Sequence, residues 1–247
     1  MKHKIIVIIL ALLASPLVNA QCEKYLKNWA IELPSKGDVD LTIAACKIWP
    51  NDPTLTIAAL PFPHKNNDSE TGAYDLEVLV ADSMTGAVVA RTYQPSAISY
   101  DAIRLTGISI DTGRYQLTPN KRAFGIRINH SGSSNIFPYD TTTLSLYVIE
   151  GKLLRAVLDR FVVGTRNGDW DGICDGTFST KSRSIDIGKP GIDGFATLKV
   201  IEQNTRSISK LSDGECVTQD SRQQPTNFSL AYRNGSYQTP KKMTLEF

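Results

Sequence analysis

The chain has 247 residues, of which 41% are hydrophobic and 21% are charged, and its formal net charge is +2. A chain of this length can bury one substantial core or two small ones. The near balance of charge argues against a nucleic-acid partner, whose binding depends on an excess of Lys and Arg facing phosphate. It argues equally against a polybasic membrane-binding surface.

The first twenty residues have the pattern of a secretory signal peptide. A basic start precedes an apolar run from Ile5 to Ala14, and Val18 and Ala20 are the small residues expected at the −3 and −1 positions of a cleavage site. The apolar run is shorter than the ~20 residues that cross a bilayer core. We therefore expect cleavage between Ala20 and Gln21, a periplasmic or secreted location, and a mature chain of residues 21–247 with no membrane span.

Beyond residue 40 the apolar residues alternate instead of recurring at helical spacing, which is typical of β-strands. Only residues 23–33 (EKYLKNWAIEL) predict a helix. Residues 74–82 alternate clearly, and a turn at residues 84–86 leads into a second strand, which predicts a β-hairpin. Further strands of this kind are predicted within residues 104–111, 122–130, 143–150, 153–163, 183–188, 195–203 and 227–238.

A faint internal repeat indicates how these strands are organised. Residues 123–158 run strand, polar loop, strand, glycine turn, strand, and residues 194–240 have the same order. Residues 74–90 resemble part of a third copy. Such a unit buries its apolar face only when it stacks on another. The prediction is an all-β fold, either a propeller-like array of antiparallel hairpins or a β-sandwich, with at most a short N-terminal helix. We expect one domain over residues 21–247, and a subdivision would fall near residues 165–175.

The segment GIDGFATLKV, followed by FSLAYRNGSYQ, is similar to FG-GAP or integrin-type β-propeller repeats. In that family a Gly/Asp-rich turn leads into a strand, and a Tyr-x-x-Gly-x-x-Tyr-like hairpin closes the blade. The resemblance covers Gly191–Gln238 and implies a propeller. Ala196 and Thr197 depart from the pattern, since the family usually has an acidic residue there. The whole chain also resembles exported proteobacterial proteins, which implies a location but no chemistry.

Four cysteines follow the leader: Cys22, Cys46, Cys174 and Cys216. An even number in an exported chain favours disulfides, and four cysteines allow three pairings. We expect nearest neighbours to pair, Cys22 with Cys46 and Cys174 with Cys216. A zinc site is the competing interpretation. Its usual spacing is missing, because no two cysteines lie two to four residues apart.

The Asp/Gly-rich residues 165–180 (TRNGDWDGICDGTFST) have two interpretations. Five of the six ligand positions of a twelve-residue calcium loop are filled, by Asn167, Asp169, Asp171, the Ile173 carbonyl and Asp175. Phe178 stands where a bidentate Glu belongs. In the alternative, which we favour, the Asp residues stabilise two successive turns through hydrogen bonds to nearby amides, and the Cys174 disulfide fixes the loop without an ion. Calcium is thus a candidate ligand, and no cofactor is required.

The loop at residues 131–140 (SGSSNIFPYD) carries Phe137 and Tyr139 beside a proline, and Trp170 lies in the Asp/Gly-rich segment. Aromatic side chains on loops often anchor contacts with proteins or carbohydrates. We therefore predict these three as interaction residues. The alternative is that the loop folds its aromatic side chains back over a strand edge.

Catalysis finds little support in the sequence. His130 precedes a serine-rich stretch, but a nucleophile elbow needs Gly-x-Ser-x-Gly, and only Gly132 is present. We identify no catalytic residue. The sequence favours an exported, non-catalytic binding or interaction protein whose partner is an envelope or secreted protein or polysaccharide. Two alternatives stay open: a hydrolase acting on a cell-envelope polymer, and an inhibitor of a partner enzyme or purely structural protein.

Overall fold

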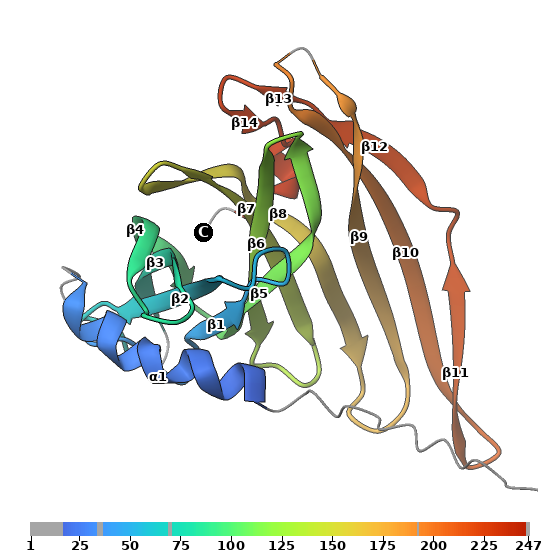
Figure 1. Ribbon diagram of the computed structural model, residues 1–247. Helices are drawn as coiled ribbons and strands as arrows, with labels where there is room; N and C mark the ends of the chain where they lie inside the picture. The colour runs from blue at the N-terminus through green and yellow to red at the C-terminus, as the bar shows by residue number, and fades with distance from the viewer. Residues whose placement is uncertain (1–16, 34–36, 69–70, 192, 246–247) are drawn as a thin grey trace, which may run out of the picture.

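The computed structural model describes residues 17–33, 37–68, 71–191 and 193–245, and these form a strand-rich fold with one α-helix (Figure 1). The elements are α1 (Leu17–Glu32), β1 (Ala45–Ile48), β2 (Leu55–Pro63), β3 (Gly72–Asp82), β4 (Val88–Tyr100), β5 (Ile103–Thr118), β6 (Lys121–Gly132), β7 (Tyr139–Glu150), β8 (Leu153–Trp170), β9 (Gly176–Pro190), β10 (Ala196–Ser212), β11 (Glu215–Arg222), β12 (Thr226–Leu230), β13 (Tyr232–Arg233), β14 (Ser236–Tyr237) and a 3-10 helix, η1 (Lys241–Met243). The prediction of an all-β fold with a short N-terminal helix is confirmed.

Twelve of the strands belong to one curled sheet. Its main path runs β1-β2-β3-β4-β8-β7-β6-β5, and β9 to β12 extend it from the far part of β8. Neighbouring strands are antiparallel except β4 and β8, which pair in parallel only at Arg91 and Leu153. Strand β8 therefore joins two regions, because it pairs with β4, with β7 and with β9. It runs through residues 165–170 without a break.

The curl of the sheet creates two β-sandwich cores that share a middle layer. In the first core, aliphatic side chains of β2, β3 and β4 face those of β5, β6 and β7, around Val78 and Phe124. In the second core, the other face of β5 to β8 packs against β9, β10 and β12, around Phe161 and Leu198. Of the two architectures predicted, a propeller-like array and a sandwich, the layers correspond to the sandwich, since twelve strands share one sheet and are not divided into separate blades (Figure 1).

Helix α1 covers the outer face of β2 and β3 and is attached to the sheet at two places. The disulfide between Cys22 and Cys46 joins the helix to β1. The indole N–H of Trp29 donates a hydrogen bond to the carbonyl of Gly86 in the β3–β4 turn, at 2.7 Å. Gly86 has φ 76°, and a Cβ there would lie 2.5 Å from the ring of Tyr25. Glycine at this turn therefore allows the helix to pack closely.

The predicted helix at residues 23–33 is present, but it begins earlier, at Leu17. Residues 1–16 of the expected leader lie outside the described residues, and α1 runs through the expected cleavage point between Ala20 and Gln21. Within the described part of the chain, no helix combines the length and the apolar character needed to cross a membrane.

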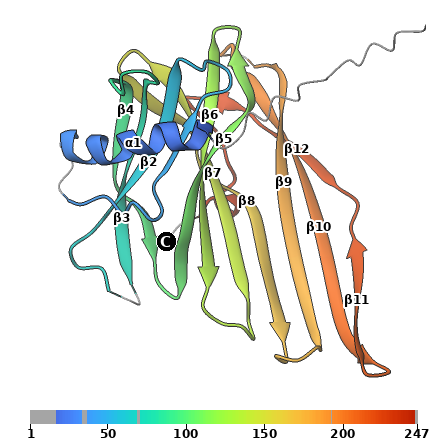
Figure 2. The same cartoon turned by 60° about the horizontal axis from the view of Figure 1, so that its bottom comes forward.

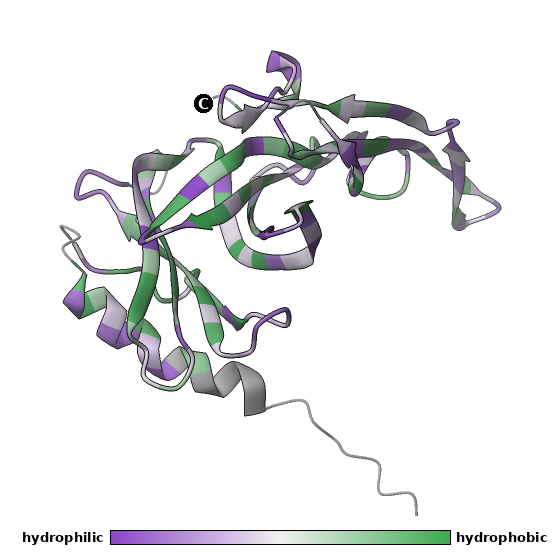
Figure 3. Cartoon of the chain, turned by 45° about the horizontal axis from the view of Figure 1, so that its top comes forward, coloured by the Kyte–Doolittle hydropathy of each residue, from purple (hydrophilic) through white to green (hydrophobic). Residues whose placement is uncertain are grey.

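Beyond the second core, β8 to β11 continue as a sheet whose two faces are largely exposed (Figure 2). Every residue of β11 is exposed, and it pairs on one side only, with β10. Hydrophobic segments concentrate on the layered strands, whereas the outermost hairpin is mainly hydrophilic (Figure 3). This projecting sheet carries the candidate functional site at its end.

Candidate functional site

Three turns meet where the projecting sheet ends: the β6–β7 loop (residues 133–138), the β8–β9 turn (residues 171–175) and the β10–β11 turn (residues 213–214). We call this region the three-turn end. The backbone N–H groups of Gly168 and Trp170 donate to the carbonyls of Pro138 and Ile136, which aligns the β6–β7 loop with the last residues of β8. A disulfide then joins the β8–β9 turn to β11.

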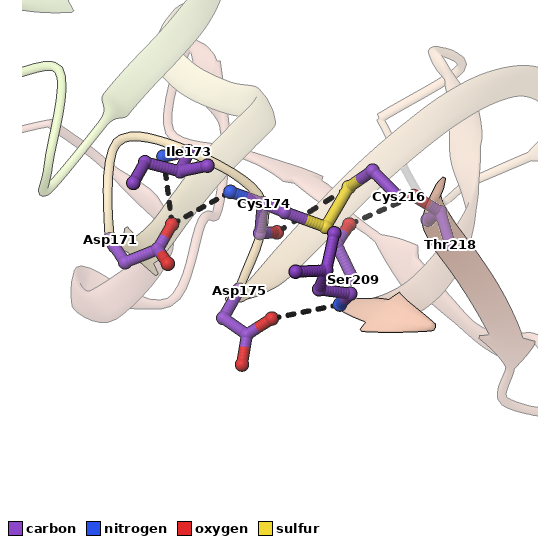
Figure 4. Close-up of a disulfide and its surroundings, with 8 residues drawn as sticks. Asp171, Ile173, Cys174, Asp175, Ser209, Cys216 and Thr218 are labelled. Carbon is purple, nitrogen blue, oxygen red and sulfur yellow. Dashed lines mark hydrogen bonds between the residues drawn. A yellow bond between two sulfur atoms is a disulfide. The ribbon is translucent and has the colours of Figure 1, made fainter. Parts of the chain in front are cut away.

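That disulfide links Cys174 to Cys216, with their Cα atoms 5.6 Å apart (Figure 4). Together with the pair formed by Cys22 and Cys46, it confirms the nearest-neighbour pairing predicted from the sequence. Cystines persist in oxidising compartments and are rare in the cytosol. The two disulfides therefore indicate an oxidising, extracytoplasmic compartment.

The Asp/Gly-rich turn is held by hydrogen bonds from backbone amides to carboxylates. One oxygen of Asp171 accepts from the N–H groups of Ile173 and Cys174, each at 2.8 Å (Figure 4). These amides hold the pKa of Asp171 below its usual value. Asp175 accepts from the backbone N–H of Leu211, at 2.9 Å, and so connects the second and third turns. The contacts agree with the turn interpretation.

The five predicted calcium ligands are divided between a strand and a turn. Asn167 and Asp169 belong to the extended part of β8, whereas Asp171 and Asp175 lie in the turn that follows. Among the residues that the structure describes, no three His, Cys, Asp or Glu side chains are grouped as a metal ion requires. Calcium binding stays a prediction that needs its own test.

Titration with calcium and a variant of the turn distinguish the two interpretations. If Asp171 acts through its amide hydrogen bonds, the melting temperature of the wild type will not respond to millimolar calcium. In that case Asp171→Ala will lower the melting temperature even when no calcium is present. A calcium site would instead give a dose-dependent rise in melting temperature, and Asp169→Ala combined with Asp171→Ala would abolish that rise. Thermal denaturation at constant ionic strength measures both.

A hollow of about 410 Å³ lies beside the β6–β7 loop and contains two of the three predicted interaction residues. Its aromatic lining is Tyr139, Trp170 and Phe178, all half-buried. The guanidinium of Arg166 lies over the Phe178 ring, 5.3 Å from its centre. Phe178 covers Gly168, whose Cβ, if it had one, would lie 2.4 Å from that ring. The backbone therefore requires glycine for this packing.

The polar side of the same hollow is a chain of charged and hydroxyl groups. Ser131 donates a hydrogen bond to Asp140, at 2.6 Å. The second oxygen of Asp140 lies 3.6 Å from a guanidinium nitrogen of Arg166. Both charged side chains are about half exposed, so water screens this ion pair and it contributes little to stability. Both groups are open to a ligand.

Large apolar side chains outside the lining of the hollow are exposed to solvent at the three-turn end. Ile173 is 82% exposed and Phe137 is 62% exposed. Ile136 and Leu211 are also exposed. Val217 is exposed on the opposite face of the β10–β11 hairpin, because it pairs with Lys210 while Leu211 pairs with Cys216. The sequence predicted Phe137 but not these aliphatic neighbours, because only the β10–β11 register and the disulfide bring their turns together.

The histidines do not form a catalytic group with the nearby serines. His130 is buried on β6, while the hydroxyl of its neighbour Ser131 bonds to Asp140. Successive side chains on a strand point to opposite faces, so the two cannot act together. His64 lies 2.6 Å from Asp75, which also accepts hydrogen bonds from Tyr93 and from the backbone N–H of Ser96. Burial alone would raise the pKa of Asp75, but these hydrogen bonds outweigh it and lower the pKa.

Comparison with protein-family models, curated proteins and solved structures finds no match. The resemblance of Gly191–Gln238 to FG-GAP repeats therefore stays a prediction. Function has to be inferred from the geometry of this chain alone.

Proposed function

We propose that this chain is an exported interaction protein whose three-turn end binds a partner protein of the cell envelope or the secreted medium. The observation that carries the proposal is the set of exposed apolar side chains at the three-turn end, led by Phe137 on the first turn and Ile173 on the second. Water-exposed apolar patches with polar rims mark interaction sites in folded proteins. The leader and the two disulfides support a location outside the cytoplasm.

The surroundings of these side chains resemble the composition of a protein interface. A phenylalanine and several aliphatic side chains form the centre, and Trp170 and Arg166 lie beside them. Trp, Tyr and Arg contribute most of the binding energy in interfaces. Exposed acidic side chains occur on the second and third turns and at the start of β11: Asp171, Asp175, Asp213 and Glu215. This charge favours a partner whose own rim is basic, since complementary charges speed association.

The exposed aliphatic side chains favour a protein over a polysaccharide. Ile173 and Leu211 offer apolar area but no hydrogen bonds for the hydroxyl groups of a sugar. The hollow beside them, with Tyr139 and Trp170, would suit a polysaccharide better. Loss of binding in Trp170→Ala together with full binding in Ile173→Ala would assign a polysaccharide instead.

Co-purification from envelope extract with matched variants tests the proposal. Phe137→Ala combined with Ile173→Ala should reduce recovery of the partner at least about fivefold, because truncation of central interface residues costs more than about 1 kcal/mol each. Met84→Ala is the control, since Met84 is 84% exposed but lies on the distant β3–β4 turn. Equal recovery of the partner with the wild type, the double variant and Met84→Ala would contradict the proposal.

A further inference from the structure

A second hollow, of about 310 Å³, lies at the opposite end of β6 from the three-turn end. It is formed where the β1–β2 turn (residues 49–54) approaches the β5–β6 turn (residues 119–120). Its polar lining consists of Trp49, Asn51, Asp52, Gln116, Asn120, Lys121 and Arg122. One oxygen of the Asp52 carboxylate is engaged, because it accepts hydrogen bonds from the backbone N–H and the hydroxyl of Thr54. Most of these groups are hydrogen-bond donors, which distinguishes this hollow from the aromatic one.

Two of the donors in this hollow are buried without an acceptor. Within the described residues, the indole N–H of Trp49 and the Nε–H of Arg122 have no hydrogen-bond partner. Trp49 is 4% exposed. A buried donor without an acceptor destabilises the folded state, and such groups are rare in folded proteins. Two of them on the wall of one hollow indicate that an oxygen-bearing ligand completes it.

The charges around the hollow favour an anion. Arg122 has no carboxylate partner among the described ion pairs, and its Nη1 donates to the Asn51 side chain, at 2.7 Å. Lys121 shares Glu150 with Arg155, at 2.7 and 2.8 Å. Hydrogen bonds from Arg155 and Lys121 lower the pKa of Glu150 to about 2. One carboxylate thus stays ionised between two cations. With Asp52 also counted, the three cations Lys121, Arg122 and Arg155 exceed the two carboxylates by one charge.

We propose that this hollow binds the oxyanion group, carboxylate or phosphate, of a small solute. The guanidinium of Arg122 and the indole N–H of Trp49 donate to its oxygens. Guanidinium groups suit both anions, because their donors lie in a fixed planar fork. Both nitrogens are buried, so binding requires the side chains that cover them to shift. This site is separate from the proposed partner-binding surface.

Packing around Trp49 allows a variant that removes only the donor. The indole meets the Phe124 ring edge-on, with centres 5.8 Å apart. Phenylalanine at position 49 keeps an apolar ring against Phe124 but lacks the N–H. Arg122→Gln removes the charge and the unpaired Nε–H. Arg206→Gln is the matched control, because Arg206 is an exposed cation on β10 that does not line this hollow.

The three tryptophans of the chain permit a direct test by NMR of the ¹⁵N-labelled protein. Titration with inorganic phosphate and, separately, with acetate should move the Trp49 indole resonance downfield until it saturates. The resonances of Trp29 and Trp170 should stay in place. Trp49→Phe identifies the Trp49 resonance by its loss. Sodium chloride at equal ionic strength should produce no such shift. If only phosphate or only acetate shifts the Trp49 resonance, the result supports the site and assigns its ligand to that class of anion.

Affinity in the variants decides whether the two donors bind the anion. Arg122→Gln should weaken binding about tenfold or more, as expected for a lost hydrogen bond to a charged group. Arg206→Gln should leave it unchanged. A thermal-shift titration extends the measurement to Trp49→Phe, which should also bind more weakly. The proposal is wrong if neither anion moves the Trp49 resonance, if chloride moves it equally, or if Arg122→Gln binds as the wild type does.

Discussion

Replacing Arg91 with methionine should lower the free energy of unfolding at pH 7 by about 3–5 kcal/mol, because it leaves a buried carboxylate without its partner. Glu77 on β3 is completely buried, and Arg91 on β4 donates to both of its oxygens, each at 2.8 Å. Burial raises the pKa of Glu77, while the hydrogen bonds and charge of Arg91 act against that rise. Removal of Arg91 therefore raises this pKa further.

The pH dependence of this effect follows from the raised pKa. A carboxyl whose pKa is higher in the folded protein than in the unfolded chain favours folding at low pH, and this contribution is lost as the pH rises through the folded pKa. The deficit of Arg91→Met should therefore be large at pH 7 and smaller near pH 4. Urea denaturation at the two pH values measures it. An equal deficit at both would contradict the assignment.

Two further variants separate the charge pair from its packing. Glu77→Gln should cost less than Arg91→Met, because the Arg91 side chain is about one-third exposed and its charge can reach water. An apolar pair, Glu77→Leu with Arg91→Met, should recover most of the loss. If the apolar pair is as unstable as Arg91→Met alone, the cost comes from packing and not from an unpaired charge.

Replacing both Cys174 and Cys216 with serine should lower the free energy of unfolding by about 3–4 kcal/mol. These cysteines are 42 positions apart, and a cross-link across such a loop restricts the unfolded chain by roughly this amount in the chain-entropy model. Guanidinium denaturation of the oxidised wild type and the variant gives the difference. A loss below about 1 kcal/mol would contradict this account of the three-turn end.

The loss of this disulfide should also be visible locally. Every residue of β11 is exposed, so the strand has little buried apolar area to hold it against β10. Amide exchange in β11 should therefore accelerate more than exchange in β6, which lies in both cores. Removing the disulfide of Cys22 and Cys46 is the matched control, because it should accelerate exchange in α1 and leave β11 protected. Equal acceleration in β6 and β11 would indicate global unfolding only.

The sequence pattern predicted most of the strands, but β1, β2 and β11 were missed. Residues Leu55–Pro63 of β2 are buried on both faces, between α1 and the first core, so their apolar run has no period of two. The prolines at its end also resemble a loop. Every residue of β11 is exposed, so the strand has no alternation of buried and exposed residues to recognise. Its position depends on its register with β10 and on the disulfide of Cys216.

The candidate site could be predicted only in its local parts. The spacing of the cysteines and the aromatic residues of two loops were recognisable in the sequence, and the disulfide pairing is confirmed. Their meeting at one end depends on strand register, which no local pattern reveals. Phe178 was considered only as a defect in a calcium loop, whereas it packs over Gly168 and lines the hollow. The buried pair of Glu77 and Arg91 also depends on register.

The two hollows lie at opposite ends of β6, and their linings differ in chemistry. The end of β6 near Gly132 adjoins aromatic and aliphatic side chains that suit a protein surface. The end near Lys121 adjoins donors that suit an oxyanion. Strand β6 contributes side chains to both cores and runs from one hollow to the other.

Site-specific photo-cross-linking tests the proposed interaction surface most directly. A photoreactive phenylalanine analogue is placed at position 137, 173 or 84 in separate chains expressed with their leader, and the intact cells are irradiated. We expect an adduct of the same defined mass from positions 137 and 173 and none from the equally exposed position 84. No adduct from either turn position, or the same adducts from all three, would contradict a partner-binding role for the three-turn end.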